Sequence, residues 1–166
     1  MSYDVRHVFR TNHGKRTVGP PIPAAPGPSY SSTGQEGRDL KILIVDDSEP
    51  VGARLVALLR RVEGLEFLPQ VFSARDADLA FRSDLPEVVL LDLQLRDGTS
   101  LGLLRDIKAK APSTRVFVLT AHLDERYRKP CLDSGADFYL SKTTDLPLLA
   151  GILADLAREL GSKRPV

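Results

Sequence analysis

The stretch "EVVLLDLQLRDG", residues 87–98, decides the fold and raises the first chemical question. Its four apolar residues, Val88 to Leu91, lead without interruption into Asp92. A continuous apolar run of this kind predicts a strand covered on both faces, as in the middle of a parallel sheet. A carboxylate at the end of such a strand is costly to bury. Asp92 is therefore either an N-cap for the next helix or a group with a chemical role.

The flanking sequence repeats this alternation of apolar runs and helical patterns. Apolar runs predict five strands, at residues 40–45, 65–73, 87–92, 114–120 and 136–141. Apolar residues at helical spacing predict five helices, at residues 50–62, 74–84, 100–110, 124–133 and 146–160. Pro69 lacks a backbone donor, so the second strand is expected at an edge of the sheet. Five strand–helix units predict an α/β fold, a doubly wound parallel sheet with helices on both faces.

A proline-rich segment, "GPPIPAAPGPSYSSTGQEG" at residues 19–37, precedes these units. Prolines lack a backbone donor and Gly/Ser stretches stay loose, so this segment cannot build a core. We predict a disordered tail at residues 1–38, one globular domain at 39–161 and a short polar end at 162–166. The basic stretch "RHVFRTNHGKR", residues 6–16, is either a solvated part of this tail or a contact for a phosphate or an acidic partner.

Composition narrows the class of protein further. The 166 residues are 42% hydrophobic and 27% charged, with a net charge of +1, which points to neither nucleic acid nor membrane as a partner. Cys131 is the single cysteine, so no internal disulfide can form and a reducing cytoplasm is expected. The sequence has no apolar run near the ~20 residues that span a bilayer, and residues 1–10 lack the apolar core of a secretory signal.

Chemically active residues follow four of the predicted strands. They are Asp46 and Asp47 after the first strand, Asp92 at the third, Thr120 at the fourth and Lys142 after the fifth. Carboxyl ends of parallel strands share one sheet edge, where ligands bind. Two like charges roughly 4 Å apart repel by about 4 kcal/mol at an effective dielectric of 20. A hard divalent cation with oxygen ligands offsets that repulsion, so the carboxylates predict a Mg²⁺ site.

The same residues suit the acceptance of a phosphoryl group. An ionised aspartate can act as the nucleophile and form an aspartyl phosphate, and Asp92 is the candidate. The metal and Lys142 would hold the equatorial oxygens, where charge accumulates in the transition state. Thr120 would donate a hydrogen bond to the phosphoryl group.

The four segments that carry these residues resemble the receiver domain of bacterial two-component response regulators. They are "ILIVDDS" (42–48), "VVLLDLQLRDG" (88–98), "VFVLTAH" (116–122) and "SGADFYLSK" (134–142). The resemblance covers the whole predicted globular domain. It implies a flavodoxin-like (βα)5 fold, with a five-stranded parallel sheet of order 2-1-3-4-5.

The resemblance also implies a role for each matching residue. Asp92 would be the phosphoacceptor, with Lys142 and Thr120 as its catalytic partners. Mg²⁺ would be held by Asp46, Asp47, Asp92 and the backbone carbonyl of Gln94. Thr120 and Tyr139 would form the switch. Gln94 and His122 would tune the lifetime of the acyl phosphate.

Three residues depart from the family's usual pattern. Thr143 follows Lys142 where the family often has a proline, and a cis bond before a non-proline residue costs ~3 kcal/mol, so a trans peptide is expected. Pro130 predicts a fourth helix that is kinked or that starts late, with Pro130 in its first turn. Arg96 stands where the family often has proline; it either steers an incoming phosphate or points outward.

The resemblance implies a histidine kinase or a histidine phosphotransfer protein as the phosphodonor. We expect a stand-alone cytoplasmic regulator that is no enzyme beyond its own phosphorylation and dephosphorylation. No helix-turn-helix pattern is visible, so the expected output is protein–protein contact with a partner or a second copy. The fourth helix, fifth strand and fifth helix would form that contact, with no nucleic acid and no membrane involved.

Two other functions remain open at this point. A phosphorylation-independent interaction module on the same fold would have no reason to keep all five site residues. A metal-dependent phosphatase with an aspartate nucleophile usually needs a second acid two residues later, and that position is Gln94.

Overall fold

The computed structural model describes residues 38–96 and 98–162 of the chain. Most of the predicted tail at residues 1–38 and of the end at 162–166 lies outside the described residues, so these boundaries stay predictions. The main sheet contains β1 (Leu40–Val45), β2 (Leu65–Phe67), β3 (Val88–Asp92), β6 (Arg115–Thr120) and β7 (Phe138–Ser141). The helices are α1 (Glu49–Leu59), α2 (Ala74–Asp84), α3 (Leu101–Lys110), α4 (Glu125–Asp133) and α5 (Leu146–Ser162).

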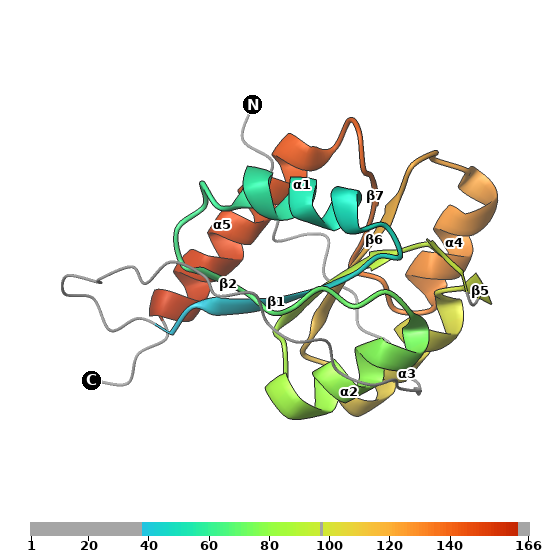
Figure 1. The fold of residues 1–166 in the computed structure, drawn as a ribbon, viewed down its shortest axis with the longest axis horizontal. Coiled ribbons are helices and arrows are strands. Elements are labelled where there is room, and N and C mark those ends of the chain that lie inside the picture. The colour runs from blue at the N-terminus through green and yellow to red at the C-terminus, as the bar shows by residue number, and fades with distance from the viewer. Residues whose placement is uncertain (1–37, 97, 163–166) are drawn as a thin grey trace.

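The five strands lie in the order β2-β1-β3-β6-β7, and every neighbouring pair is parallel. This is the predicted order 2-1-3-4-5, and the flavodoxin-like fold is confirmed. In Figure 1, α1 and α5 lie on one side of the sheet and α2, α3 and α4 on the other. The strand order reverses between β1 and β3, so the carboxyl ends of these two strands flank the crevice where such folds bind ligands.

The apolar run of β3 is buried because helices cover both faces of the sheet. Val88 and Leu90 pack with residues of α1 and α5. Val89 and Leu91 point the other way and pack with residues of α2, α3 and α4. All four are at most 1% exposed. Each buried side chain of this size contributes about 1.5–3 kcal/mol, so the run that predicted a central strand also stabilises both layers.

The predicted second strand is longer than the observed one. β2 ends at Phe67, two residues before Pro69. Pro69 has no N–H to add to the ladder, yet the chain stays beside β1: the Leu68 and Val71 amides donate to the carbonyls of Ile42 and Ile44, at 2.9 and 3.0 Å. The edge position of this strand is confirmed.

Pro130 lies inside α4 as its sixth residue, so the predicted late start of this helix is wrong. The helix begins at Glu125 because the Asp124 carboxylate accepts a hydrogen bond from the Arg126 amide at 2.9 Å, which caps its first turn. The expected trans peptide between Lys142 and Thr143 is confirmed, because the described residues contain no cis peptide bond.

A buried charge network joins α3 to the amino ends of β6 and β7. Lys108 is 1% exposed, and its ammonium contacts a carboxylate oxygen of Asp137 at 2.5 Å and donates to the Thr114 carbonyl at 2.7 Å. The other Asp137 oxygen accepts from Arg115 at 3.0 Å. Burial lowers the pKa of Lys108, and the Asp137 carboxylate opposes that change. Sequence analysis gave no sign of this network.

Two short strands, β4 (Gln94–Leu95) and β5 (Gly98–Thr99), pair antiparallel directly after β3. They were not predicted, because two-residue strands leave no periodic pattern. This hairpin places Arg96 beside the end of β1. In the described part of the chain, no helix combines the length and apolar character needed to cross a membrane.

Candidate functional site

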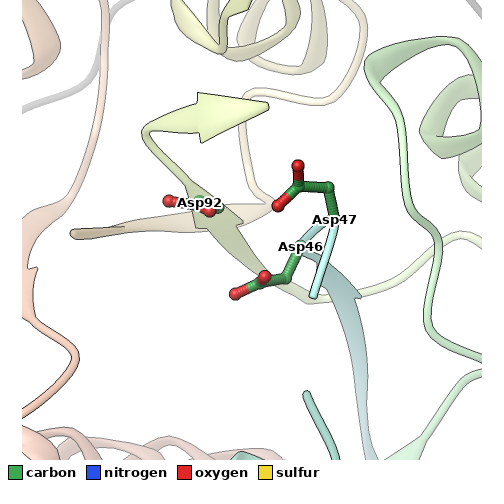
Figure 2. Close-up of side chains that lie close together, drawn as sticks. All are labelled: Asp46, Asp47 and Asp92. Atoms are coloured by element: carbon green, nitrogen blue, oxygen red, sulfur yellow. The ribbon is translucent and has the colours of Figure 1, made fainter. Parts of the chain in front are cut away.

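The carboxyl ends of the neighbouring strands β1 and β3 gather three aspartates, as the sequence predicts. Asp46 and Asp47 directly follow β1, and Asp92 is the last residue of β3. Figure 2 shows the three carboxylates at the crevice between these strands. One oxygen of each lies within 4.8 Å of the others. Asp46 and Asp92 are buried, at 2% and 8% exposure, so little water screens their mutual repulsion.

Lys142 crosses the carboxyl edge of the sheet to meet two of these acids. Its ammonium lies 2.6 Å from Oδ2 of Asp46 and 2.8 Å from Oδ2 of Asp92. Burial raises the pKa of the Asp92 carboxyl, and the hydrogen bond and charge of Lys142 oppose that rise. The lysine therefore offsets part of the repulsion that the aspartates create.

Ser141 organises the loop that carries Lys142 and Thr143, the latter at the position where the family often has a proline. The Ser141 hydroxyl accepts from the amides of Thr143 and Thr144, at 3.2 and 3.3 Å. The Ser141 amide donates to the Asp145 carboxylate at 2.8 Å. The Lys142 amide donates to the Thr120 carbonyl at 2.8 Å. These bonds fix the loop with a trans peptide after Lys142.

Thr120 and Tyr139 lie on adjacent strands, and both contact the loop before α4. Thr120 is buried at the end of β6 and its hydroxyl donates to the His122 carbonyl at 3.0 Å. The Tyr139 ring is buried, and its hydroxyl donates to the Asp124 carbonyl at 3.2 Å. The Asp124 amide donates back to the Tyr139 hydroxyl at 3.3 Å. The two predicted switch residues thus hold the same loop.

Gln94 and His122 are both exposed at the rim of the site. The Gln94 amide donates to Oδ1 of Asp92 at 3.2 Å. The structure therefore brings Asp46, Asp47, Asp92 and Lys142 into direct proximity. The Lys142 amide joins Thr120 to this cluster, and the loop that follows Thr120 contacts the Tyr139 hydroxyl through Asp124.

Sequence analysis missed the residue that holds the two aspartates after β1. The Gln70 side-chain amide donates to the carbonyls of Asp46 and Ser48, at 2.9 and 3.1 Å. The Ser48 amide in turn donates to Oδ1 of Asp46 at 2.9 Å. No pattern marks Gln70, because it follows β2 in a loop whose course depends on tertiary pairing with β1.

Ser100 is a second residue that the sequence did not indicate as part of the site. The buried Ser100 hydroxyl donates to the Asp92 carbonyl and so fixes the end of β3.

Arg96 neither points away from the site nor stands free to steer a phosphate. Its guanidinium contacts the Asp47 carboxylate at 3.2 Å.

The donor set of this site consists of oxygens. Three carboxylates with one nearby ammonium leave a net negative cluster, and hard cations such as Mg²⁺ prefer this kind of ligand. The residues present therefore fit Mg²⁺, with Asp46, Asp47 and Asp92 as the candidate ligands.

Gly52 in α1 leaves room for the Gln70 amide, which gives the first prediction. A Cβ at position 52 would lie 1.9 Å from Oε1 of Gln70, so the amide must move in Gly52→Ala. Its bonds to Asp46 and Ser48 would be lost, and we expect Mg²⁺ affinity to fall roughly tenfold, the lower end for groups that orient metal ligands. Isothermal titration calorimetry with Mg²⁺ measures this effect.

Gly151→Ala in α5 is the matched control, because a Cβ there meets no atom within 4 Å. It should leave Mg²⁺ affinity unchanged and raise the free energy of unfolding by up to about 1 kcal/mol, the helix-propensity difference between Gly and Ala. Unchanged Mg²⁺ affinity in Gly52→Ala would show that Gln70 does not position the site.

Comparison with known proteins identifies relatives that share this fold. The response regulator protein VraR of Staphylococcus epidermidis is 31% identical over 120 residues, which cover 72% of this chain and 56% of VraR. A DNA-binding response regulator of the LuxR family from Staphylococcus aureus superposes with a TM-score of 0.64 at 21% identity, over 71% of this chain and 98% of that one.

A third relative is a response regulator from Burkholderia pseudomallei, whose structure contains a phosphorylated aspartic acid, a calcium ion and citrate. It superposes with a TM-score of 0.62 at 23% identity, over 77% of this chain and 76% of that one. The two structural likenesses show a shared fold.

These relatives correct one prediction. This chain spans about half the length of the curated relatives it matches, and one structural relative is described as DNA-binding. The predicted stand-alone regulator that has no DNA-binding output and acts through protein contacts alone is therefore wrong, and the exclusion of nucleic acid is not supported. The physical reason is that the recognisable residues of this domain serve phosphoryl transfer. They therefore do not indicate whether the domain controls a protein contact or the binding of DNA.

The family described as the response regulator receiver domain matches residues 42–154, which is more than half of the chain. The match begins inside β1, includes Asp46, Asp47 and all of β3, and ends inside α5. The family match, the strand order of the sheet and the aspartate cluster all fit a receiver domain. The chain therefore belongs to the response regulator receiver domain family, whose members are phosphoryl-accepting regulatory domains.

Proposed function

We propose that Asp92 accepts a phosphoryl group from a phosphohistidine on a histidine kinase or a histidine phosphotransfer protein. The observation that carries this proposal is the convergence of Asp46, Asp47, Asp92 and the Lys142 ammonium at one sheet edge. Mg²⁺, when bound, would neutralise charge on the transferring phosphoryl oxygens. The three carboxylates and the Gln94 carbonyl are its proposed ligands.

In the proposed reaction an Asp92 oxygen attacks the phosphorus in line with the donor imidazole. A new O–P bond forms, the N–P bond of the phosphohistidine breaks, and its electron pair returns to the imidazole. The Lys142 ammonium lies 2.8 Å from Oδ2 of Asp92, and it would stabilise the negative charge on the phosphoryl oxygens as the new bond forms. Asp92 attacks as a carboxylate, so the step needs no general base.

The phosphoryl group would change the contacts of Thr120 and Tyr139. It adds roughly −1.5 to −2 charge at the sheet edge. The Thr120 hydroxyl would leave the His122 carbonyl, its present acceptor, to donate to a phosphoryl oxygen. That movement shifts the loop whose Asp124 holds the Tyr139 hydroxyl and caps α4. The surface of α4, β7 and α5 would then carry the change to a partner.

One structural relative, which is described as DNA-binding, supports control of DNA binding as the output of this surface, whichever polypeptide carries the part that contacts DNA. The reaction fits a bacterial cytoplasm, since the relatives are bacterial regulators and the only cysteine, Cys131, is a free, buried thiol.

Gln94 and His122 give the second prediction. Both lie exposed at the rim of the site, where their side chains would limit the access of water to an acyl phosphate on Asp92. We expect Gln94→Ala and His122→Ala to shorten the half-life of the acyl phosphate severalfold without preventing its formation. Loss of label after the phosphodonor is removed measures the half-life. Half-lives equal to that of the parent in both variants would refute a lifetime-tuning role.

The function itself is tested by incubating the protein with Mg²⁺ and a small phosphodonor such as acetyl phosphate. One stable phosphoryl group per chain supports the proposal. No adduct would favour a phosphorylation-independent interaction module. Continuous release of inorganic phosphate without an adduct would favour a phosphatase.

A further inference from the structure

Arg96 makes a two-point contact with Asp47, the one aspartate of the cluster that Lys142 does not contact in the described structure. Its Nε lies 3.2 Å from Oδ2 of Asp47, and its Nη2 donates to the Asp47 carbonyl at 3.2 Å. The Arg96 side chain is 81% exposed, whereas that of Asp47 is 26% exposed. The guanidinium therefore reaches from the outside onto a carboxylate at the mouth of the site.

We propose that Arg96 competes with Mg²⁺ for Asp47 and so lowers the metal affinity of the unphosphorylated protein. This inference rests on the proposed metal site. Oδ2 of Asp47 already accepts a hydrogen bond from the guanidinium, so a metal that takes this oxygen shares its electron density with Arg96 or displaces the side chain. The positive charge of Arg96 also opposes the approach of a second cation. Both effects have the same sign.

The structure offers the displaced side chain a place to go. Asp47, Ser48, Glu49, Pro50, Phe72 and Arg96 line a hollow of about 480 Å³ beside the cluster. The Glu49 side chain also lines this hollow, and its carboxylate would accept from the guanidinium once Arg96 leaves Asp47. Displacement therefore exchanges one exposed ion pair for another, and its cost is small.

The contact with Asp47 depends on which residue stands at position 96 in the hairpin. Arg96 lies between β4 and β5, which follow β3 directly. A proline at this position, as the family often has, would offer no charge to Asp47. Arg96 is thus a positioning residue that acts through Asp47.

The test is calorimetric titration of Mg²⁺ into the parent, Arg96→Gln, Arg96→Lys and Arg158→Gln at low ionic strength. Arg158 forms an exposed ion pair with Asp155 in α5 and controls for the loss of one positive charge. We expect Arg96→Gln to bind Mg²⁺ roughly two- to fivefold more tightly than the parent, the range for exposed ion pairs. Arg96→Lys should fall between them, and Arg158→Gln should match the parent.

Two further readouts separate competition from a purely structural role. The gain in affinity should shrink as salt is added, because dissolved ions weaken exposed ion pairs such as the one between Arg96 and Asp47. The ¹⁵N signal of the Arg96 Nε in the parent should shift during the Mg²⁺ titration and saturate with the calorimetric affinity.

Equal or weaker Mg²⁺ binding by Arg96→Gln would overturn the inference while leaving the proposed function standing, provided that the parent binds Mg²⁺. An Nε signal that does not move would overturn it in the same way. A parent protein that does not bind Mg²⁺ at all would overturn both the inference and the proposed metal site.

Discussion

Replacing Asp92 with asparagine should reduce phosphoryl uptake to the level of a protein-free blank. The amide nitrogen of asparagine is not nucleophilic, and the change also removes one of the carboxylates proposed to hold Mg²⁺. The fold should persist, because asparagine has nearly the same shape, and the bond from Ser100 is to the backbone of residue 92. A phosphate-affinity gel after incubation with acetyl phosphate and Mg²⁺ measures the uptake.

Asp155→Asn is the matched control for this experiment. Asp155 is a carboxylate in α5 that pairs with Arg158, so its loss should leave phosphoryl uptake at the parent level. Circular dichroism spectra and thermal melting should show that both variants are folded. Uptake by Asp92→Asn at the parent rate would mean that the phosphoryl group goes elsewhere.

The largest effect on stability should come from Asp137→Ala. The substitution leaves the Lys108 ammonium buried and removes its carboxylate partner, while the bond to the Thr114 carbonyl remains. Breaking a buried pair in this way typically costs about 3–5 kcal/mol. We expect the free energy of unfolding to fall by that amount at neutral pH, as measured by urea denaturation.

The stability of the Asp137→Ala variant should depend on pH in a definite direction. Burial already lowers the pKa of Lys108, and removal of Asp137 takes away the charge that opposes this effect. The unfolded chain then binds the Lys108 proton more tightly than the folded chain does. Unfolding therefore takes up protons, and the stability of the variant should rise as pH increases toward the ordinary pKa of lysine.

Two controls separate this effect from general damage. Asp155→Ala removes a carboxylate from an exposed pair and should cost less than about 1 kcal/mol. The double variant Lys108→Met/Asp137→Leu removes both buried charges and should recover most of the lost stability. An Asp137→Ala protein as stable as the parent would show that the network contributes little to the fold.

The sequence predicted the sheet and the convergence of the site because both follow from local patterns. The run from Val88 to Leu91 indicates a strand buried on both faces, and helical spacing gives all five helices nearly in place. Once the strands are parallel, their carboxyl ends must share one edge. The proximity of Asp46, Asp92 and Lys142 then follows from the topology.

The remaining features depend on contacts between distant residues, for which the sequence carries no periodic signal. Gln70 contacts Asp46 only because the chain stays beside β1 after Pro69. Lys108 and Asp137 meet across the amino end of the sheet, 29 residues apart in sequence. Arg96 reaches Asp47 from a hairpin too short to be recognised.

The output could not be predicted for a different reason. The residues of the site serve phosphoryl chemistry, which is the same whether the signal reaches a protein or DNA. The net charge of +1 describes only these 166 residues. One structural relative is described as a DNA-binding regulator, and nothing in the local sequence indicates such an output.

The central claim is that Asp92 alone carries the phosphoryl group, and that Mg²⁺ is required to place it there. The most direct measurement is to phosphorylate the parent with acetyl phosphate, reduce the acyl phosphate with borohydride, and locate the resulting homoserine by mass spectrometry. We predict homoserine at position 92 only, in the presence of Mg²⁺ and not in the presence of a chelator. Homoserine at Asp46 or Asp47, or equal labelling of Asp92 without a divalent cation, would contradict the account.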